Sequence, residues 1–252
     1  MASKANRPKL IVDGKRLDGR AFDDLRPLKI IAGVLKNANG SAYLEQGNNK
    51  VLVGVYGPRE VIPKRDSDPT KAVIRCRYQM APFSSIEGHG RTGPNRRATE
   101  ISKVIKEAFE GVVLLEEFPN NEIDVYIEIL QSDGGTRAAG LTAASVALAN
   151  AGIPMKDLVY AVSAGKVDDD VILDLNMIED NYSDADMPTA MTHRNNDILL
   201  LQMDGEFTKE QFAKALGMIT EAGKKISAVQ RQALTDVYER EEKRTKTDEV
   251  TL

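Results

Sequence analysis

Residues 123–150 read IDVYIEIL-QSDGGTR-AAGLTAASVALAN, a run that contains a strand pattern, a glycine turn and a helix pattern in succession. Over 123–130, branched apolar side chains alternate with polar ones, which is the period of a strand with one buried face. Residues 138–150 are small and apolar, and Gly152 follows them as a helix-end signal. The two glycines within 133–137 suit the change of direction from strand to helix. The chain therefore combines both kinds of regular structure.

Comparable patterns lie on both sides of this run. Further strands are predicted at 28–35, 42–46, 51–56, 72–80, 160–167, 171–175, 188–193 and 198–203. Further helices are predicted at 96–116, with Asn95 as the N-cap, and at 208–238. Because strands precede a helix in each half, we predict an α+β fold with two similar lobes of mixed β-sheet packed with helices. The lobes are expected at about 16–118 and 119–240 of a single domain (16–240), between a flexible N-terminal tail (1–15) and a charged C-terminal tail (241–252).

The composition excludes several classes of protein. The chain has 252 residues, 34 Lys+Arg against 38 Asp+Glu, and 42% hydrophobic residues, so it can bury a core and is not a disordered chain. It contains no run of about 18 apolar residues and no apolar signal segment at the start, so we expect neither a membrane span nor secretion. A single cysteine, Cys76, excludes an internal disulfide and fits a reducing compartment, so we expect a cytoplasmic protein. Two histidines are too few for the usual His/Cys zinc site.

Charge is distributed unevenly, although the net charge is only −4. Residues 59–97 contain nine basic and four acidic side chains, whereas residues 168–186 contain eight acidic side chains and no Lys or Arg. Each stretch is compatible with a solvated loop. The basic stretch is equally compatible with local binding of a polyanion by a mildly acidic protein.

Two predicted helix starts carry residues that suit an anion. In the glycine turn, backbone N–H groups and the helix dipole favour negative charge, and Thr136 and Arg137 add a hydroxyl and a guanidinium group. At the other start, Arg96 and Arg97 oppose the helix dipole, and a bound anion would offset that cost. For each of the two, an ordinary turn with solvated arginines is the alternative.

Carboxylates cluster after the predicted strand at 171–175. They are Glu179, Asp180, Asp184 and Asp186, and they are expected on a loop. Carboxylate oxygens suit a hard divalent cation such as Mg²⁺ or Mn²⁺, although the spacing is not that of an EF-hand. An exposed acidic loop without a ligand is the alternative.

Short motifs spread over residues 16–238 form a recognisable set. They are RLDGR (16–20), LRP (25–27), GSAYLEQGN (40–48), YGPRE (56–60), PFS (82–84), RRATEIS (96–102), GTR (135–137), LDL (173–175), ED (179–180) and ADM (185–187). As a set they resemble the RNase PH family, and they are most similar to its archaeal exosome branch.

The resemblance implies the catalytic subunit of an archaeal exosome ring, a phosphate-dependent 3′→5′ exoribonuclease. Inorganic phosphate, the co-substrate, would attack the last phosphodiester of single-stranded RNA and release a nucleoside diphosphate; the reverse reaction would add 3′ tails. The implied partners are a sister RNase PH-like subunit in a hetero-hexameric ring and RNA-binding cap subunits. Two alternatives remain. A non-catalytic RNA-binding ring subunit is disfavoured by the acidic pair, and a bacterial-type RNase PH that trims tRNA as a homo-hexamer is disfavoured by the motif at 56–60.

The resemblance also implies roles for particular residues. The phosphate binders are Gly135, Thr136, Arg137 and Arg97. The catalytic residues, which also bind Mg²⁺ or Mn²⁺ near the leaving 3′ oxygen, are Asp180 and Asp186. Protonation of the leaving group by Asp180 remains open.

Contacts to RNA phosphates would be independent of the RNA sequence. They are expected from Arg96, Arg97, Lys64 and Arg65, with a solvated loop as the alternative for the last two. Tyr78 is predicted to be a core residue and not a platform for base stacking.

Overall fold

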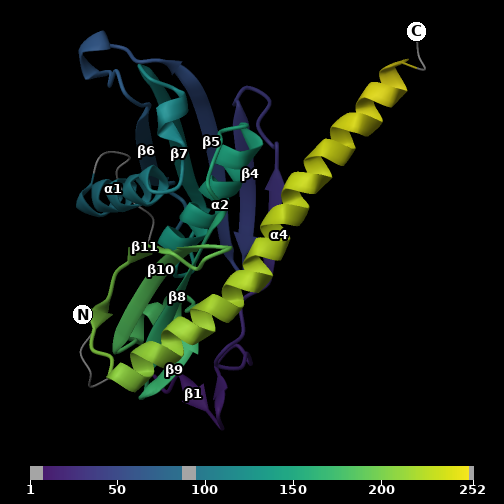
Figure 1. Cartoon of the computed structure of the whole chain (residues 1–252). Helices are drawn as coiled ribbons and strands as arrows, with labels where there is room; N and C mark the ends of the chain where they lie inside the picture. Colours follow the sequence, from purple (N-terminus) through teal and green to yellow (C-terminus); the bar gives the residue numbers. More distant parts are fainter. Residues whose placement is uncertain (1–7, 87–94, 250–252) are drawn as a thin grey trace.

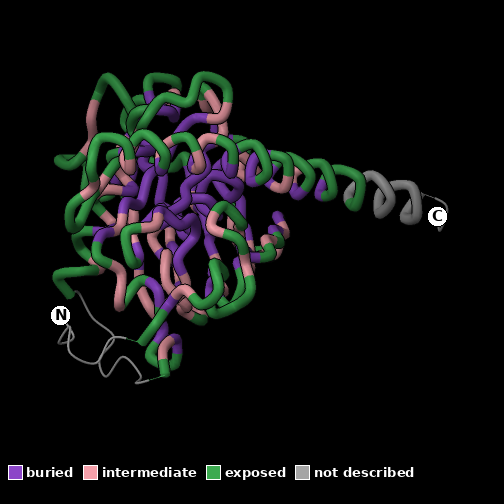
Figure 2. Tube along the Cα trace, turned by 90° about the horizontal axis from the view of Figure 1, so that it is seen from below, coloured by how far each residue is buried: buried purple, intermediate pink, exposed green. Residues whose placement is uncertain are grey.

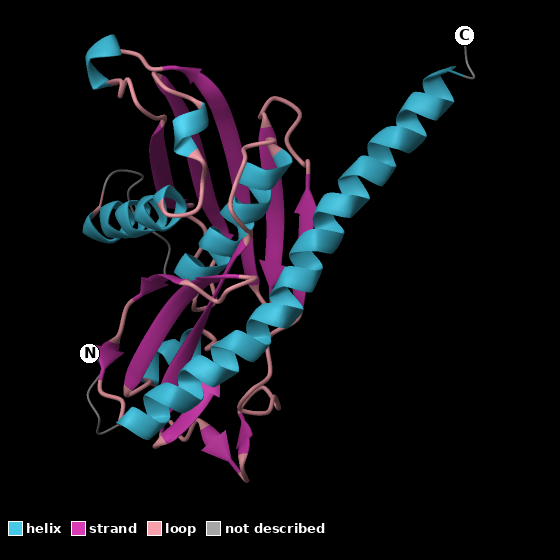
Figure 3. Cartoon of the chain, viewed as in Figure 1, coloured by secondary structure: helices cyan, strands magenta, loops and turns pink. Residues whose placement is uncertain are grey.

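The computed structural model describes residues 8–86 and 95–249 and shows two β-sheets with helices between and beside them (Figure 1, Figure 3). The first sheet has the order β3 (Leu28–Ala32), β4 (Gly40–Gln46), β5 (Asn49–Glu60), β7 (Asn121–Gln131), β6 (Val73–Met80). It is mixed, because β6 and β7 pair in parallel whereas the other neighbours are antiparallel. The first sheet therefore continues beyond residue 118, where we expected the first lobe to end, since the apolar face of β7 packs into the same core as β5.

The second sheet is antiparallel throughout, so only the first sheet is mixed. Its order is β11 (Ile198–Leu201), β10 (Ala185–Thr192), β8 (Val159–Val167), β9 (Asp170–Leu173), and β12 (Asp204–Gly205) pairs with the start of β10.

A small hairpin precedes both sheets. It consists of β1 (Ile11–Val12) and β2 (Lys15–Arg16). Leu10, next to it, is buried against Val167, Ile172 and Leu175. The described part of the expected flexible tail is therefore packed on the second sheet, because an apolar side chain anchors it.

Helix α2 (Thr136–Asn150) lies between the sheets, in contact with β4 and β5 on one side and β8 on the other. It is buried along most of its length because its side chains are small. A Cβ at Gly140 would lie only 3.1 Å from Ile127 Cγ2, so the helix approaches the first sheet closely. The turn before α2 contacts Asn49 at the start of β5 and Asn176 after β9. That turn consequently lies where the two sheets meet.

Helix α4 (Lys209–Glu249) crosses both sheets and contacts β3, β8 and β9. Its C-terminal part extends away from the body of the protein (Figure 1, Figure 2). The helix was predicted to end at residue 238, but it continues through the described part of the expected tail, since residues 239–249 contain no glycine or proline and many good helix formers. Neither this helix nor any other in the described part of the chain has the length and apolar character needed to cross a membrane.

Helix α1 (Arg96–Glu110) packs on β6 and β11. The Oδ1 atom of Asn95 accepts a hydrogen bond from the Ala98 N–H at 2.7 Å, which confirms the predicted N-cap. The helix ends six residues before the predicted residue 116, because Gly111 has a low helix propensity, and a 3₁₀ turn at Leu115–Glu117 follows.

Candidate active site

The glycine turn before α2 is held in a conformation that only glycine adopts readily. Gly134 and Gly135 have φ angles of 71° and 66°, in the left-handed region. A Cβ on Gly134 would lie 2.6 Å from the carbonyl carbon of Asn176, so the turn touches the segment that leads into the acidic stretch. The first turn of α2 has no side-chain cap, which leaves backbone N–H donors available to an anion.

Thr136 is fixed by a buried tyrosine. The hydroxyl groups of Tyr78 and Thr136 form a hydrogen bond of 2.8 Å. Burial raises the pKa of Tyr78, while the bond to Thr136 and the charges of Arg97 and Arg137 lower it. Tyr78 is thus a core residue, as predicted, but its hydroxyl also sets the orientation of Thr136, which the sequence pattern did not indicate.

Arg137 is tied to two elements that are remote in sequence. Its Nη1 donates to Oε1 of Gln202, which follows β11, and its Nη2 donates to Oε1 of Glu100 on α1 at 3.2 Å. The Gln202 Nε2 also donates to Glu100 Oε1, at 2.9 Å. Among the described residues, the buried Nε of Arg137 has no partner. A bound oxyanion would satisfy this donor. Sequence analysis gave no role to Glu100 or Gln202, although Glu100 belongs to the motif at 96–102 that carries the family resemblance.

The two carboxylates predicted to be catalytic lie near each other. Asp180 is in a short helix, α3 (Met177–Tyr182), and Asp186 is in β10, opposite Asp204 of β12. Burial, Asp180 and Asp204 raise the pKa of Asp186 to about 6. Burial also raises the pKa of Asp180. Like charges that interact in this way share one site.

The carboxylates and the anion-binding groups share that site. Arg97 and Arg137 both lower the pKa of Asp180 and of Asp186, so their charges act on each carboxyl group. Arg96 and Arg97 are exposed at the start of α1. The structure therefore brings together the glycine turn, Arg97 of α1 and the aspartate pair, which lie far apart in sequence.

Other residues of the acidic stretch are arranged differently from the expectation. Residues 177–182 do not form an irregular loop, because a capping box between Asn176 and Glu179 starts a helix there. Glu179 is 1% exposed and paired with Arg16, so it is not available to a cation. In the part of the chain that the structure describes, no group of three or more His, Cys, Asp or Glu side chains is placed to hold a metal ion. Two aspartates still suit Mg²⁺, which is often held by one or two carboxylates together with water and substrate phosphates.

Lys64 and Arg65 do not belong to this site. They lie in a 3₁₀ turn (Lys64–Asp66) with their side chains 84% and 85% exposed, and Lys64 pairs with Glu60. Strand β5 runs from Asn49, beside the glycine turn, to Glu60, and its 12 residues span roughly 35 Å at the usual rise per residue. The turn lies at the far end of the first sheet (Figure 1).

The raised pKa of Asp186 predicts that its charged form lowers the free energy of unfolding. In metal-free buffer, Asp186→Asn is expected to raise the free energy of unfolding at pH 7 by about 1–3 kcal/mol, since each pKa unit corresponds to about 1.4 kcal/mol. The folded protein holds this proton up to about pH 6, whereas the unfolded chain releases it near the ordinary value of 3.8. The charged carboxyl group therefore destabilises the fold above pH 6, and the cost disappears as the pH falls below 4.

Urea denaturation at pH 7 and pH 4 measures this effect. Asp236→Asn, on an exposed face of α4, is the matched control and should change little. A stabilisation of Asp186→Asn that is equal at both pH values would contradict the prediction.

Two models of one family match the chain in succession. The model of domain 1 of the 3′ exoribonuclease family (RNase PH) matches residues 24–154, and the model of domain 2 matches residues 157–221. The chain belongs to this family. Both the resemblance and the predicted RNase PH-like α+β fold are thereby confirmed.

Curated relatives and solved structures agree with this assignment. The chain is 55% identical over 236 residues to the exosome complex component Rrp41 of Thermoplasma acidophilum, covering 93% of this chain and 95% of that one. It is 55% identical over 226 residues to Rrp41 of Pyrococcus furiosus, covering 90% of each. Rice Rrp46 superposes with a TM-score of 0.77 at 27% identity, over 87% of this chain and 100% of that one. The Archaeoglobus fulgidus exosome with RNA bound to the active site gives a TM-score of 0.75 at 24% identity, over 86% and 92%, which is a likeness of fold.

Proposed function

We propose that this chain is the catalytic subunit of an exosome ring and shortens single-stranded RNA from its 3′ end with inorganic phosphate. One observation supports the proposal most strongly. The helix start that suits an anion lies near two aspartates, and the charges of Arg97 and Arg137 act on both carboxyl groups. Family membership supplies the 3′-exoribonuclease activity, and the relatives named as exosome components support the assembly.

The reaction brings two anions together, a phosphate and a phosphodiester. Donors that are in place beforehand must offset this repulsion in the transition state. The N–H groups at the start of α2, the Thr136 hydroxyl and the Arg137 guanidinium hold the attacking phosphate, and Arg97 is the second clamp. The bond that forms joins phosphate to the terminal phosphorus, the bond that breaks leads to the 3′ oxygen, and a nucleoside diphosphate leaves.

Asp180 and Asp186 would hold Mg²⁺ or Mn²⁺, which when bound acts as a Lewis acid at the leaving 3′ oxygen. The raised pKa of Asp180 also leaves it suited to protonate that oxygen. The two roles remain alternatives in this proposal.

RNA would be held by its phosphates, without regard to sequence. Arg96 and Arg97 border the site and contact the 3′ end. Lys64 and Arg65, at the far end of β5, would contact the strand at a distant point, outside the chemistry. The proposed partners are a sister RNase PH-like subunit in a hetero-hexameric ring and RNA-binding cap subunits. The proposed location is the cytoplasm.

Product analysis tests the reaction. Uniformly labelled single-stranded RNA is incubated with Mg²⁺ and this chain, alone and mixed with the sister subunit, in the presence and absence of phosphate. We expect nucleoside diphosphates only when phosphate is present. Nucleoside monophosphates without phosphate would show hydrolysis and overturn the proposal.

The same experiment separates the alternatives. Normal RNA affinity without turnover, even beside the sister subunit, would indicate a non-catalytic ring subunit. Full activity of the chain alone as a homo-hexamer would favour a bacterial-type RNase PH.

A further inference from the structure

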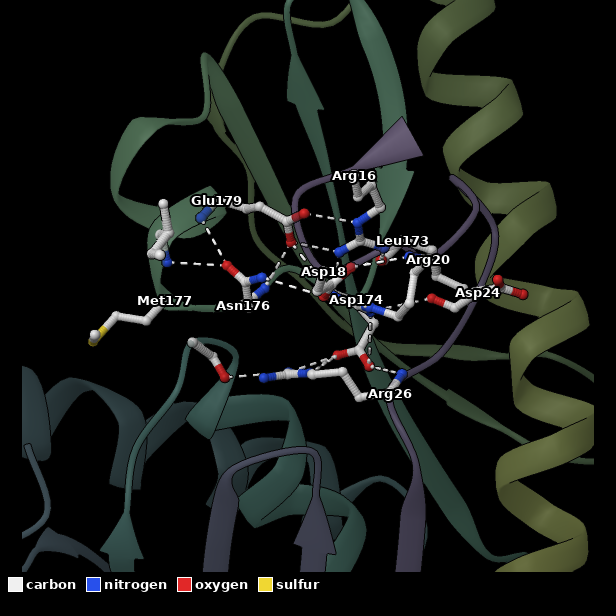
Figure 4. Close-up of polar contacts among 12 residues, drawn as sticks. Arg16, Asp18, Arg20, Asp24, Arg26, Leu173, Asp174, Asn176, Met177 and Glu179 are labelled. Carbon is white, nitrogen blue, oxygen red and sulfur yellow. Dashed lines mark hydrogen bonds and ion pairs between the residues drawn. The ribbon is translucent and has the colours of Figure 1, made fainter. Parts of the chain in front are cut away.

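Two arginines of the N-terminal motifs are almost completely buried, and the reaction described above assigns them no role. Arg16 is 3% exposed and Arg26 is 5% exposed. Burying a guanidinium group lowers the stability of the fold unless all its N–H groups are paired, so the partners of each arginine indicate what it does. Figure 4 shows the two arginines beside Asp174 and Glu179, and Arg26 also contacts the glycine turn.

Arg16 joins the end of β9 to helix α3. Its Nε and Nη2 donate to the two carboxylate oxygens of Glu179 at 2.7 and 2.5 Å, a two-pronged pair. Its Nη1 donates to the Leu173 carbonyl oxygen at 2.6 Å. Glu179 also accepts from the Asn176 N–H at 2.9 Å (Figure 4). Arg16 therefore fixes the first turn of α3 against the second sheet.

The orientation of α3 determines where Asp180 points. A helix of six residues has little stability of its own, so tertiary contacts must hold it. Asp180 follows Glu179 directly, and successive residues of a helix are rotated by about 100°. Anchoring Glu179 in the interior thus directs Asp180 outward, into the site.

Arg26 joins the same region to the glycine turn. Its Nη2 and backbone N–H donate to the Asp174 carboxylate at 2.6 and 2.8 Å. Its Nη1 donates to the Asp133 carbonyl oxygen, and its Nη2 also donates to the Gly134 carbonyl oxygen at 3.3 Å. In a trans peptide the N–H points opposite to the carbonyl. The N–H groups of Gly134 and Gly135 are therefore directed away from Arg26.

The two arginines meet at Asp174. This residue is 2% exposed and has a φ angle of 54°, and its carbonyl oxygen accepts from Arg16 Nη2 at 3.0 Å. Gln46 Nε2 donates to its Oδ1 at 2.9 Å. One continuous network consequently connects the base of α3 to the base of the glycine turn.

We propose that Arg16 and Arg26 are positioning residues, Arg16 for Asp180 and Arg26 for the phosphate-binding turn. Neither contacts the substrate, and each acts through its partners. The inference rests on the proposed function and assigns separate kinetic effects to the two residues.

Lysine substitutions in the assembled ring test it, since lysine keeps the charge but cannot form the two-pronged contacts. Arg16→Lys should lower kcat about 10- to 100-fold with the phosphate KM unchanged, because a displacement of about 1 Å can cost 100-fold. Arg26→Lys should raise the phosphate KM about tenfold with a smaller effect on kcat. Arg194→Lys, whose partner Asp157 lies outside the site, is the control.

The changes in kcat, phosphate KM and melting temperature distinguish a positioning role from a purely structural one. If both arginines only stabilise the fold, both variants lower the melting temperature but keep kcat and KM per folded molecule, and the inference is overturned. The same holds if both variants change the same constant. If Arg16→Lys does not fold, Arg16→Gln takes its place, because glutamine keeps one N–H donor for Glu179 and leaves the capping box of α3 intact. This variant should fold and still show the kcat loss; normal kcat would overturn the inference.

The wild-type ring is assayed in parallel. If it releases no nucleoside diphosphate, the proposed function fails. If it does and the variants behave like wild type, only the positioning role fails.

Discussion

Replacing Asp180 with asparagine is expected to lower the kcat of RNA phosphorolysis by about 1,000-fold, the scale of losing a general acid or a metal ligand. Asparagine has nearly the same shape, so α3 and its contacts through Glu179 should persist. RNA affinity should change little, because Arg96 and Arg97 remain. Release of nucleoside diphosphate measures the first effect, and fluorescence anisotropy with labelled RNA measures the second.

The matched control for this variant is Asp169→Asn. Asp169 lies in the same acidic stretch, 91% exposed and paired with Lys166. It should retain normal activity. Activity of Asp180→Asn within tenfold of the wild type would rule out both roles that we assign to this carboxylate.

Loss of Arg137 is expected to weaken the use of phosphate more than that of RNA. Arg137→Ala should lower kcat/KM for phosphate by about 100- to 1,000-fold, as for the loss of one oxyanion donor. Arg137→Lys should lie between this variant and the wild type, because lysine offers a point charge in place of a planar fork. The unpaired Nε in the described structure is the donor that lysine cannot replace.

Initial rates at varied phosphate concentration measure this effect, and the reverse reaction provides a control. Since a catalyst does not change the equilibrium, tailing from nucleoside diphosphates must lose kcat/KM by the same factor when RNA is saturating. An unchanged phosphate KM with a raised RNA KM would instead make Arg137 an RNA contact.

Several local features could be predicted from sequence because their causes are local. The alternation at 123–130 and the small residues at 138–150 placed β7 and α2. Asn95 was predicted as an N-cap from its side chain alone, and the structure has that cap. The anion site at the start of α2 was inferred from two glycines, Thr136 and Arg137, because these donors are contiguous in sequence, and it stays a prediction.

Features that depend on distant partners were not predictable in the same way. Glu179 and Asp180 were expected on a loop, but Arg16 and Asn176 hold residues 177–182 as a helix. Lys64 and Arg65 are basic like Arg96 and Arg97, yet β5 carries them to the other end of the sheet. The N-terminal residues were predicted to be flexible, but Leu10 is buried against apolar side chains of the second sheet.

Local patterning and the inventory of charged groups thus follow from the order of residues, because strand period, caps and turns act over a few positions. Which carboxylates face the substrate depends on the assembled fold. Glu179 and Asp174 are paired with arginines more than 140 positions away in the chain, whereas the charges of Arg97 and Arg137 act on the carboxyl groups of Asp180 and Asp186 at the candidate site. Charges interact through space, and the packing of α2 between two sheets brings these side chains together.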